Sequence, residues 1–269
     1  MNIEKLKIIA RESRINVVKM IYEAGSGHPG GSLSCIEILV ALYFVEMNIN
    51  PKEPNNPERD RFVLSKGHAA PALYAVLSKR GYFPEEELLK LRKIGSILQG
   101  HPDMKKTPGV DMSSGSLGQG LSVANGMALA GKLDQKDYNV YVLLGDGELE
   151  EGQIWEAVMT AAHYKLDNLV VFVDYNRLQI DGNVVEIKSI KNINERFGSF
   201  GWGTKTINGH NLPEIFEALK EAKESKTPYV IIANTVKGKG ITYMENEVDW
   251  HGKAPSSQEL DQALAELKD

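Results

Sequence analysis

Two short runs of apolar, mostly branched residues with an amphipathic stretch between them form the clearest pattern in the chain. The runs occupy positions 140–144 and 169–173. Continuous apolar runs of this length are typical of parallel strands that are covered on both faces. Positions 153–165 repeat apolar side chains at helical spacing. The pattern therefore predicts a βαβ unit in the middle of the chain.

The same alternation extends toward both ends of the chain. Further strands are predicted at 61–65 and 228–234. Three further helices are predicted at 3–23, from about 69 to 80 and over 117–132. Four more have only a predicted start: a cap at Ser32 or Ser34, Pro84, Asn211, and a capping box formed by Ser256 and Glu259. Positions 99–115 and 197–202 lack periodicity and are predicted to be irregular. We expect a single α/β domain over residues 1–269, with a mainly parallel sheet flanked by helices on both faces.

Composition narrows the class of protein without identifying it. The chain has 269 residues, of which 42% are hydrophobic and 25% charged, as in ordinary globular proteins. A net charge of −5 gives no electrostatic reason to expect nucleic acid as a partner. No apolar run reaches the ~20 residues that span a membrane. The single cysteine, Cys35, lies in an apolar run, so we expect it to pack in the core of a cytoplasmic protein.

Polar residues follow the two central predicted strands. Asp146 lies in the segment Gly145-Asp-Gly147 after the first, and Asn176 closes the second. Ligands bind at the carboxyl ends of parallel strands in open α/β sheets. Carboxylate and amide oxygens beside closely approaching backbone suit Mg²⁺ holding a diphosphate. Read alone, these residues could instead form a turn and a loop cap.

Five of the six histidines are next to a glycine, and they are His28, His68, His101, His210 and His251. Each falls in a predicted loop or turn, where catalytic groups are commonly placed. Together they indicate one site that uses neutral donors and acceptors and proton transfer near neutral pH. A zinc site is the alternative, but no pair has the usual ligand spacing.

The chain resembles the transketolase family of thiamine diphosphate enzymes. The matching segments occur in the family's order between residues 25 and 252. They are Ser26-Gly-His28-Pro-Gly, Ser65-Lys-Gly-His68-Ala, Gly100-His101-Pro, Ser114-Gly-Ser-Leu117-Gly-Gln-Gly-Leu, Gly145-Asp-Gly147 through Glu151-Gly-Gln-Ile-Trp-Glu156-Ala, Asn176-Arg-Leu178-Gln-Ile180-Asp-Gly, Thr235-Val-Lys237-Gly-Lys-Gly240 and Trp250-His251-Gly. The resemblance implies the diphosphate-binding (PP-type) fold of these enzymes.

The resemblance also implies how the cofactor is held. Asp146, Asn176 and the carbonyl of Leu178 match the ligands of Mg²⁺, for which another divalent cation such as Ca²⁺ or Mn²⁺ could substitute. The residues that match contacts to thiamine diphosphate are His68, Gly115, Leu117, Gly147, Ile180, Lys237 and His251. For Ile180, plain core packing is the simpler interpretation, and it would be compatible with a role beside the cofactor.

The implied reaction is the transfer of a two-carbon ketol unit from a ketose phosphate to an aldose phosphate, by default the sugars of the pentose phosphate pathway. His28, His101 and His251 match residues that face the substrate and transfer protons. Glu151 matches a glutamate of the family's dimer interface, although residues 148–151 alone would indicate a solvated acidic first turn.

In transketolases a second domain supplies a catalytic glutamate and the arginines that grip a sugar phosphate, and no segment of this chain matches either. We therefore expect the chain to be the amino-terminal subunit of a split transketolase. A separate carboxy-terminal subunit would complete an α₂β₂ assembly, without membrane or nucleic acid. The alternatives are another thiamine diphosphate carboligase, such as a deoxyxylulose-phosphate synthase, a 2-oxo acid dehydrogenase subunit, or a cofactor-binding scaffold without catalytic activity.

Overall fold

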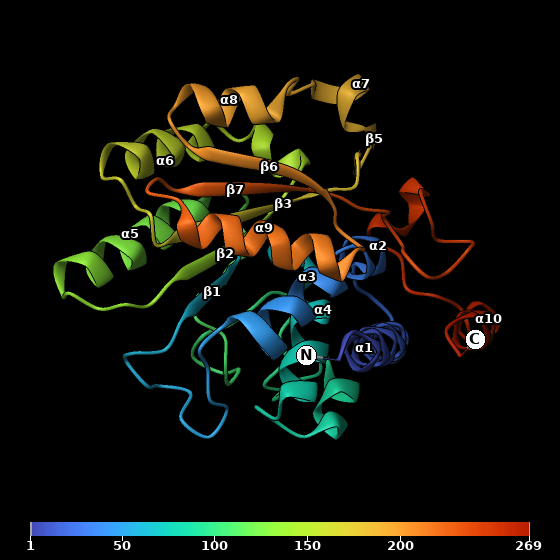
Figure 1. The fold of residues 1–269 in the computed structure, drawn as a ribbon. Coiled ribbons are helices and arrows are strands. Elements are labelled where there is room, and N and C mark those ends of the chain that lie inside the picture. The colour runs from blue at the N-terminus through green and yellow to red at the C-terminus, as the bar shows by residue number, and fades with distance from the viewer. Residues whose placement is uncertain (1, 269) are drawn as a thin grey trace.

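A five-stranded parallel sheet forms the centre of the computed structural model, which describes residues 2–268 (Figure 1). Its strands lie in the order β1-β2-β3-β7-β6, and every neighbouring pair is parallel. Their bounds are Arg61–Leu64 for β1, Val140–Gly145 for β2, Leu169–Tyr175 for β3, Tyr229–Asn234 for β7 and Gly203–Asn208 for β6. The predicted βαβ unit is confirmed, with β2 and β3 side by side in the middle of the sheet.

Helices cover both faces of this sheet, and each face has its own apolar core. The helices of one layer are α1 (Ile3–Ala24), α3 (Ile36–Ala41), α4 (Ala70–Arg80) and α9 (Leu212–Glu224). The other layer contains α5 (Gln119–Leu133), α6 (Gly152–His163) and α8 (Ile193–Ser199). Along β2, Tyr141 and Leu143 pack into the first core, whereas Val140, Val142 and Leu144 pack into the second. This alternation explains why the strand has no polar face in the sequence.

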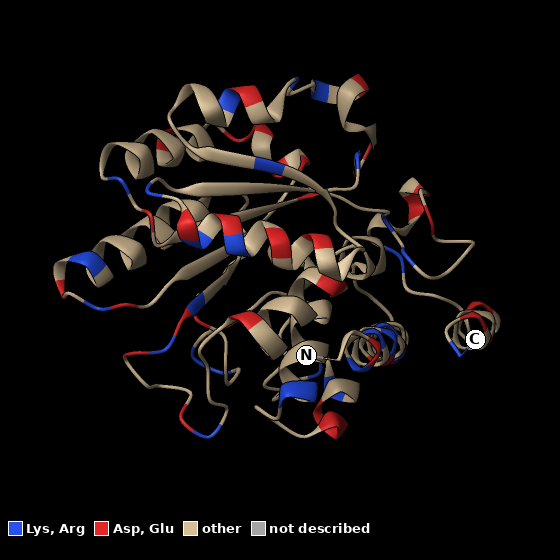
Figure 2. Ribbon diagram, viewed as in Figure 1, with Lys and Arg blue, Asp and Glu red and all other residues tan. Residues whose placement is uncertain are grey.

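Short elements connect these layers. They are α2 (Pro29–Leu33), η1 (Leu42–Glu46), η2 (Gly67–Ala69), η3 (Glu85–Lys90), η4 (Gly147–Glu150), the antiparallel pair β4 (Leu178–Gln179) and β5 (Gly182–Asn183), α7 (Val184–Lys188), η5 (Val248–His251) and α10 (Ser257–Glu266). Charged residues lie mostly on the helices and loops, and the central strands carry few (Figure 2). Within residues 2–268, no helix combines the length and apolar character needed to cross a membrane.

Two sequence predictions about secondary structure are wrong. Neither Ser32 nor Ser34 is the N-cap of the next helix, because their hydroxyls donate to the carbonyl of His28 (2.7 Å) and the carboxylate of Asp174 (2.6 Å). The segment 197–202 is not wholly irregular, since α8 continues to Ser199. The edge strand β6 was also missed, because its alternating polar residues leave only one buried side chain in the strand.

Helix α5 approaches the end of β1 closely at Gly120. A Cβ atom there would lie 2.3 Å from the Ser65 hydroxyl and 2.9 Å from the Ser65 Cα atom. On the exposed face of the same helix, a Cβ at Gly126 would meet no atom within 4 Å. The helix is therefore pressed against the carboxyl end of β1 on one side only.

Gly120→Ala should destabilise the chain by about 1–3 kcal/mol, because the added methyl group overpacks the contact with Ser65. Gly126→Ala is the matched control. It should raise the free energy of unfolding by about 0.5–1 kcal/mol, because alanine has less backbone freedom to lose in a helix. Urea unfolding of both variants measures the difference, and equal effects would contradict the close packing of α5.

Candidate active site

Four strands end at one edge of the sheet, and the residues that follow them line a single cavity of about 380 Å³. Lys66 follows β1, Asp146 follows β2, Asn176 follows β3, and Lys237 comes three residues after β7. All predicted metal-binding and cofactor-binding residues line this cavity, namely His68, Gly115, Leu117, Asp146, Gly147, Asn176, Leu178, Ile180, Lys237 and His251. Of the predicted catalytic residues, His28 and His251 also line it. The site thus lies where a parallel sheet places its ligands.

Three residues that line this cavity carry oxygen atoms of the kinds that a hard cation prefers. The carboxylate of Asp146 accepts hydrogen bonds from the backbone N–H groups of Gly147 (2.8 Å) and Arg177. The side-chain amide of Asn176 donates to Asp174 (3.3 Å), which identifies the opposite atom as the carbonyl oxygen. Together with the Leu178 carbonyl, these groups fit Mg²⁺, which prefers oxygen ligands.

The turn between the second and third donors has an unusual backbone conformation. Arg177 has a φ of 68°, in the left-handed region that non-glycine residues seldom occupy. This conformation reverses the chain between Asn176 and Leu178, so that both face the same cavity. Within residues 2–268, no three His, Cys, Asp or Glu side chains are grouped as metal ligands. The candidate cation site instead combines one carboxylate, one amide and one carbonyl.

Four histidines gather around this cavity. The ring centroid of His28 lies 5.4 Å from that of His68, 5.6 Å from that of His251 and 6.4 Å from that of His101. His68 and His251 are 5.3 Å apart. His101 is exposed and does not line the cavity itself. The prediction of one site for five histidines is wrong for His210, which contacts Glu37 and Val236 on the other side of the loop that carries Lys237.

The clustered histidines are neutral at pH 7. Burial, with help from Arg92, lowers the pKa of His28 to about 4. Burial and the nearby Lys237 ammonium lower the pKa of His251 to about 4, and burial holds the pKa of His68 well below its usual value. Buried Nδ1 of His28 has no hydrogen-bond partner among the described residues, so a bound molecule could satisfy it. The rings are therefore available as neutral donors and acceptors.

A buried ion pair, absent from the sequence predictions, lies directly beneath the site. Lys66 and Asp174 form it with side-chain exposures of 1% and 0%. Lys66 also donates to the Gly31 carbonyl (2.7 Å), and Asp174 accepts from Ser34 (2.6 Å) and Asn176 (3.3 Å). Although burial opposes ionisation of both groups, their mutual attraction lowers the pKa of Asp174 and raises that of Lys66. The only sequence signal was their position next to buried strands.

The expectation of a solvated acidic turn at residues 148–151 is wrong for Glu148. Its side chain is buried and accepts hydrogen bonds from the backbone N–H groups of Gly118 (2.9 Å) and Gly145 (3.0 Å) and from the Ser65 hydroxyl. Burial raises the pKa of Glu148. The simpler interpretation of Ile180 as core is also wrong, because this side chain is 65% exposed while lining the cavity.

The family profile described as "Transketolase, thiamine diphosphate binding domain" matches residues 5–267. The chain belongs to the transketolase family. Its fold agrees, since the crystal structure of transketolase from Campylobacter jejuni superposes with a TM-score of 0.94 and 36% identity. That superposition covers 100% of this chain and 43% of the other.

Relatives of two lengths occur within the transketolase family. A subunit of apulose-4-phosphate transketolase from Phocaeicola vulgatus is 42% identical over 100% of this chain and 96% of the relative. The 6-deoxy-6-sulfo-D-fructose transketolase subunit SqwG of Clostridium sp. is 48% identical over 92% of this chain and 90% of the relative. Human transketolase is 45% identical over 98% of this chain, which spans 42% of that protein. The chain thus matches nearly whole subunits in one group and less than half of the protein in the other.

Replacing Lys66 with methionine should destabilise the chain by about 3–5 kcal/mol, because it leaves the buried Asp174 carboxylate without its counter-charge. Lys132→Met is the matched control, since Lys132 pairs with Asp167 at 36% side-chain exposure for each partner. That loss should be about 0–1 kcal/mol. Urea unfolding of the two variants compares them, and a small effect at Lys66 would contradict a charged buried pair.

In the absence of divalent cations, the way in which the chain's stability changes with pH should depend on Asp146. Burial and the charge of Asp174 raise the pKa of Asp146 from its usual 3.8 to about 7. Between pH 3.8 and about 7 the Asp146 carboxyl therefore binds its proton more tightly in the folded chain than in the unfolded chain. As pH rises through this range, the contribution of Asp146 to the free energy of unfolding falls.

The matched variant is Asp146→Asn, which keeps the shape of the side chain but cannot titrate. Urea unfolding in a chelator at several pH values should show the variant gaining stability relative to the original chain as pH rises from about 4 to about 7. A constant difference across that range would contradict the raised pKa.

Proposed function

We propose that this chain is the cofactor-binding, amino-terminal subunit of a split transketolase. It would transfer a two-carbon ketol unit from a ketose phosphate to an aldose phosphate together with a separate carboxy-terminal subunit. The observation that carries this proposal is the cavity at the carboxyl edge of the sheet, where three oxygen donors lie beside neutral histidines. Relatives that are named as single transketolase subunits and match this chain over nearly their whole length support it further.

The proposed cofactors are thiamine diphosphate and Mg²⁺, or a similar divalent cation. Asp146, Asn176 and the Leu178 carbonyl would hold the cation. Gly147 would let the diphosphate approach the backbone, because this position carries no side chain. Thiamine diphosphate supplies an electron sink for the transferred two-carbon unit when it is bound. The ammonium of Lys237 adds the positive charge that a diphosphate needs nearby.

The protonation of His251 follows from its contact with Lys237. Lys237 Nζ lies 3.0 Å from His251 Nδ1, and an ammonium can only donate. A neutral His251 ring must then carry its proton on Nε2, where it can donate to a substrate hydroxyl. We propose that His28, His101 and His251 share this work of binding and moving protons on the sugar. His68, Gly115, Leu117 and Ile180 would line the cofactor.

The partner subunit would supply the acid and the phosphate-binding arginines for which this chain has no matching segment. Exposed apolar side chains on the cavity wall and on helix α7, whose last residue lines the cavity, support such a cover, namely Ile180 at 65%, Val185 at 54% and Ile187 at 47%. We further propose a single domain, an α₂β₂ assembly in which Glu151 lies at the dimer interface, and a cytoplasmic location. The lone, buried and unpaired Cys35 agrees with a reducing compartment.

The proposal predicts ketol transfer by the complex captured on this chain, and little by the chain alone. Xylulose 5-phosphate with ribose 5-phosphate is the default substrate pair, and the sugars in the names of the relatives form a second panel. Transfer should require both thiamine diphosphate and Mg²⁺. Robust activity of the chain alone would refute the split-subunit proposal, and decarboxylation of pyruvate would favour a different thiamine diphosphate enzyme.

Asp146→Asn should lower the transfer rate by at least about a hundredfold, because it removes the only carboxylate of the proposed cation site. Asp137→Asn is the matched control, since Asp137 is exposed and outside the cavity. Rates are measured with the partner present at saturating sugar. If the biological role survived Asp146→Asn without activity, the chain would act as a scaffold.

A further inference from the structure

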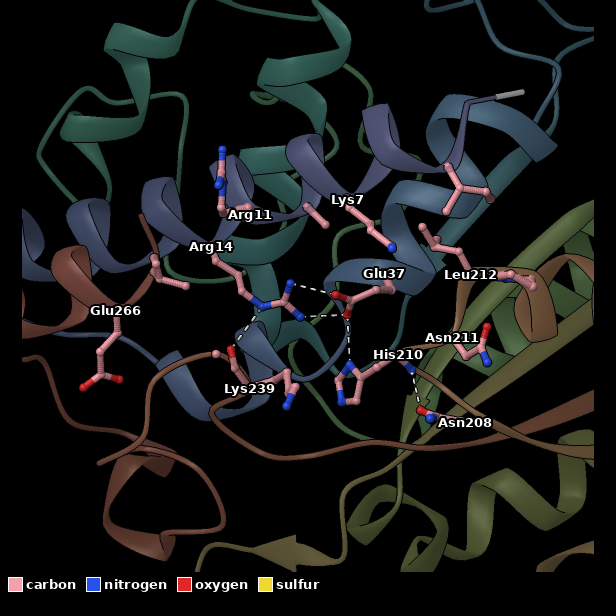
Figure 3. A pocket seen from close by; sticks show the side chains of 15 residues that line it. Lys7, Arg11, Arg14, Glu37, Asn208, His210, Asn211, Leu212, Lys239 and Glu266 are labelled. Carbon is pink, nitrogen blue, oxygen red and sulfur yellow. Dashed lines mark hydrogen bonds and ion pairs between the residues drawn. The ribbon is translucent and has the colours of Figure 1, made fainter. Parts of the chain in front are cut away.

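His210 is the glycine-linked histidine that the proposed function leaves without a role. It lies in a second cavity of about 650 Å³, between α1 and the turn that precedes α9 (Figure 3). We propose that His210 is a positioning residue, which acts with Glu37 and Arg14 to hold the loop 235–240 and thereby place Lys237 in the active site. The role of Lys237 in this inference rests on the proposed function, whereas the way in which the loop is held does not.

The hydrogen bonds of His210 define its tautomer. Nε2 accepts from the backbone N–H of Val236 at 2.9 Å, so the proton of the neutral ring is on Nδ1. Nδ1 lies 2.9 Å from a carboxylate oxygen of Glu37 and donates to it. The backbone N–H of His210 also donates to Asn208 (3.0 Å). The ring is thus fixed on both sides, and one side holds the residue just before Lys237.

Arg14 holds the same loop on the other side of Lys237. Its guanidinium forms two bonds of 2.7 Å to the two carboxylate oxygens of Glu37. Its Nε donates to the carbonyl of Lys239 at 3.0 Å. These links are drawn in Figure 3. Burial opposes ionisation of Glu37, but Arg14 and His210 outweigh it and lower the pKa of Glu37 to about 2. The arrangement is a charged, bidentate pair, which has a defined geometry.

The loop between these two anchors carries Lys237 to the opposite side, into the active site. Lys237 is buried, and its ammonium donates to the Leu178 carbonyl (3.2 Å) and contacts His251 Nδ1 (3.0 Å). Gly238 has a φ of 78° and donates its N–H to the Gly30 carbonyl (3.0 Å). A shift of the backbone at Val236 or Lys239 would therefore move the ammonium away from both of its partners.

The network joins segments that are far apart in the sequence. Arg14 belongs to α1, Glu37 to α3, and His210 to the turn between β6 and α9. A network of this kind could simply stabilise the fold. A positioning role differs in one measurable respect, because the effect of losing His210 must then pass through Lys237.

The first test measures hydrogen–deuterium exchange of the full chain without cofactor. His210→Ala should speed exchange in the peptide that covers residues 235–240 by about five- to thirtyfold, since it frees the Val236 N–H. His210→Gln keeps an acceptor for that N–H and should restore much of the protection. His163→Ala, an exposed histidine on α6, is the matched control and should leave the loop unchanged. Unchanged exchange in His210→Ala would overturn the proposal.

The second test is a double-mutant cycle. Calorimetry measures the affinity of each variant for thiamine diphosphate in the presence of Mg²⁺. Lys237→Ala should weaken binding by about ten- to a hundredfold, because it removes a charged donor. His210→Ala should weaken binding as well, and the double variant should bind no more weakly than Lys237→Ala alone. Additive losses would show that His210 acts independently of Lys237 and would overturn the positioning role.

The two tests separate this inference from the proposed function. If the original chain bound no thiamine diphosphate, the proposed function would fail, while the exchange result would still decide whether His210 holds the loop. If the cofactor bound normally and His210→Ala altered neither exchange nor affinity, the positioning role alone would fail.

Discussion

The buried ion pair between Lys66 and Asp174 is the interaction on which the rest of the site depends. It joins the ends of β1 and β3, and the burial of both side chains makes the loss of either charge costly. Asp174 also binds Ser34, Asn176 and Thr235, so the pair holds the loop after β7 and orients a proposed cation ligand. One carboxylate thereby ties four separate segments together beneath the cavity.

The wall of the cavity above this pair carries both acidic and basic residues, so an anionic cofactor depends on where the basic ones lie. Since Lys66 is neutralised by Asp174, the other ammonium groups of the cavity wall are those of Lys237 and Lys188, and of these two only Lys237 is buried. Burial and Lys66 lower the pKa of Lys237 to about 8, which still leaves it charged at neutral pH. The surrounding histidines stay neutral because burial disfavours their charged forms. The buried Lys237 ammonium must therefore be placed accurately to meet an anionic cofactor.

That requirement gives the network behind the loop its significance. Arg14 and His210 contact backbone atoms on either side of Lys237, and Glu37 binds the side chains of both. Two ion pairs thus support the active site. Lys66 and Asp174 hold the ends of the strands, and Arg14 and Glu37 hold the loop that carries Lys237. Both supports join helices and strands that are distant along the chain, so the position of each polar group depends on the assembled fold.

Local patterns were enough to predict the central strands, most helices, and the edge of the sheet where the site lies. Apolar runs identified β2 and β3, and short motifs identified Asp146, Asn176 and the histidines of the cavity, because these signals lie within a few neighbouring residues. The edge strand β6 was not predicted, since a half-exposed strand has no continuous apolar run. The partners of Lys66, Glu148 and His210 could not be read from the chain either. They include contacts across 26 to 173 residues, and a charged side chain looks the same in a sequence whether it is solvated or buried against its partner.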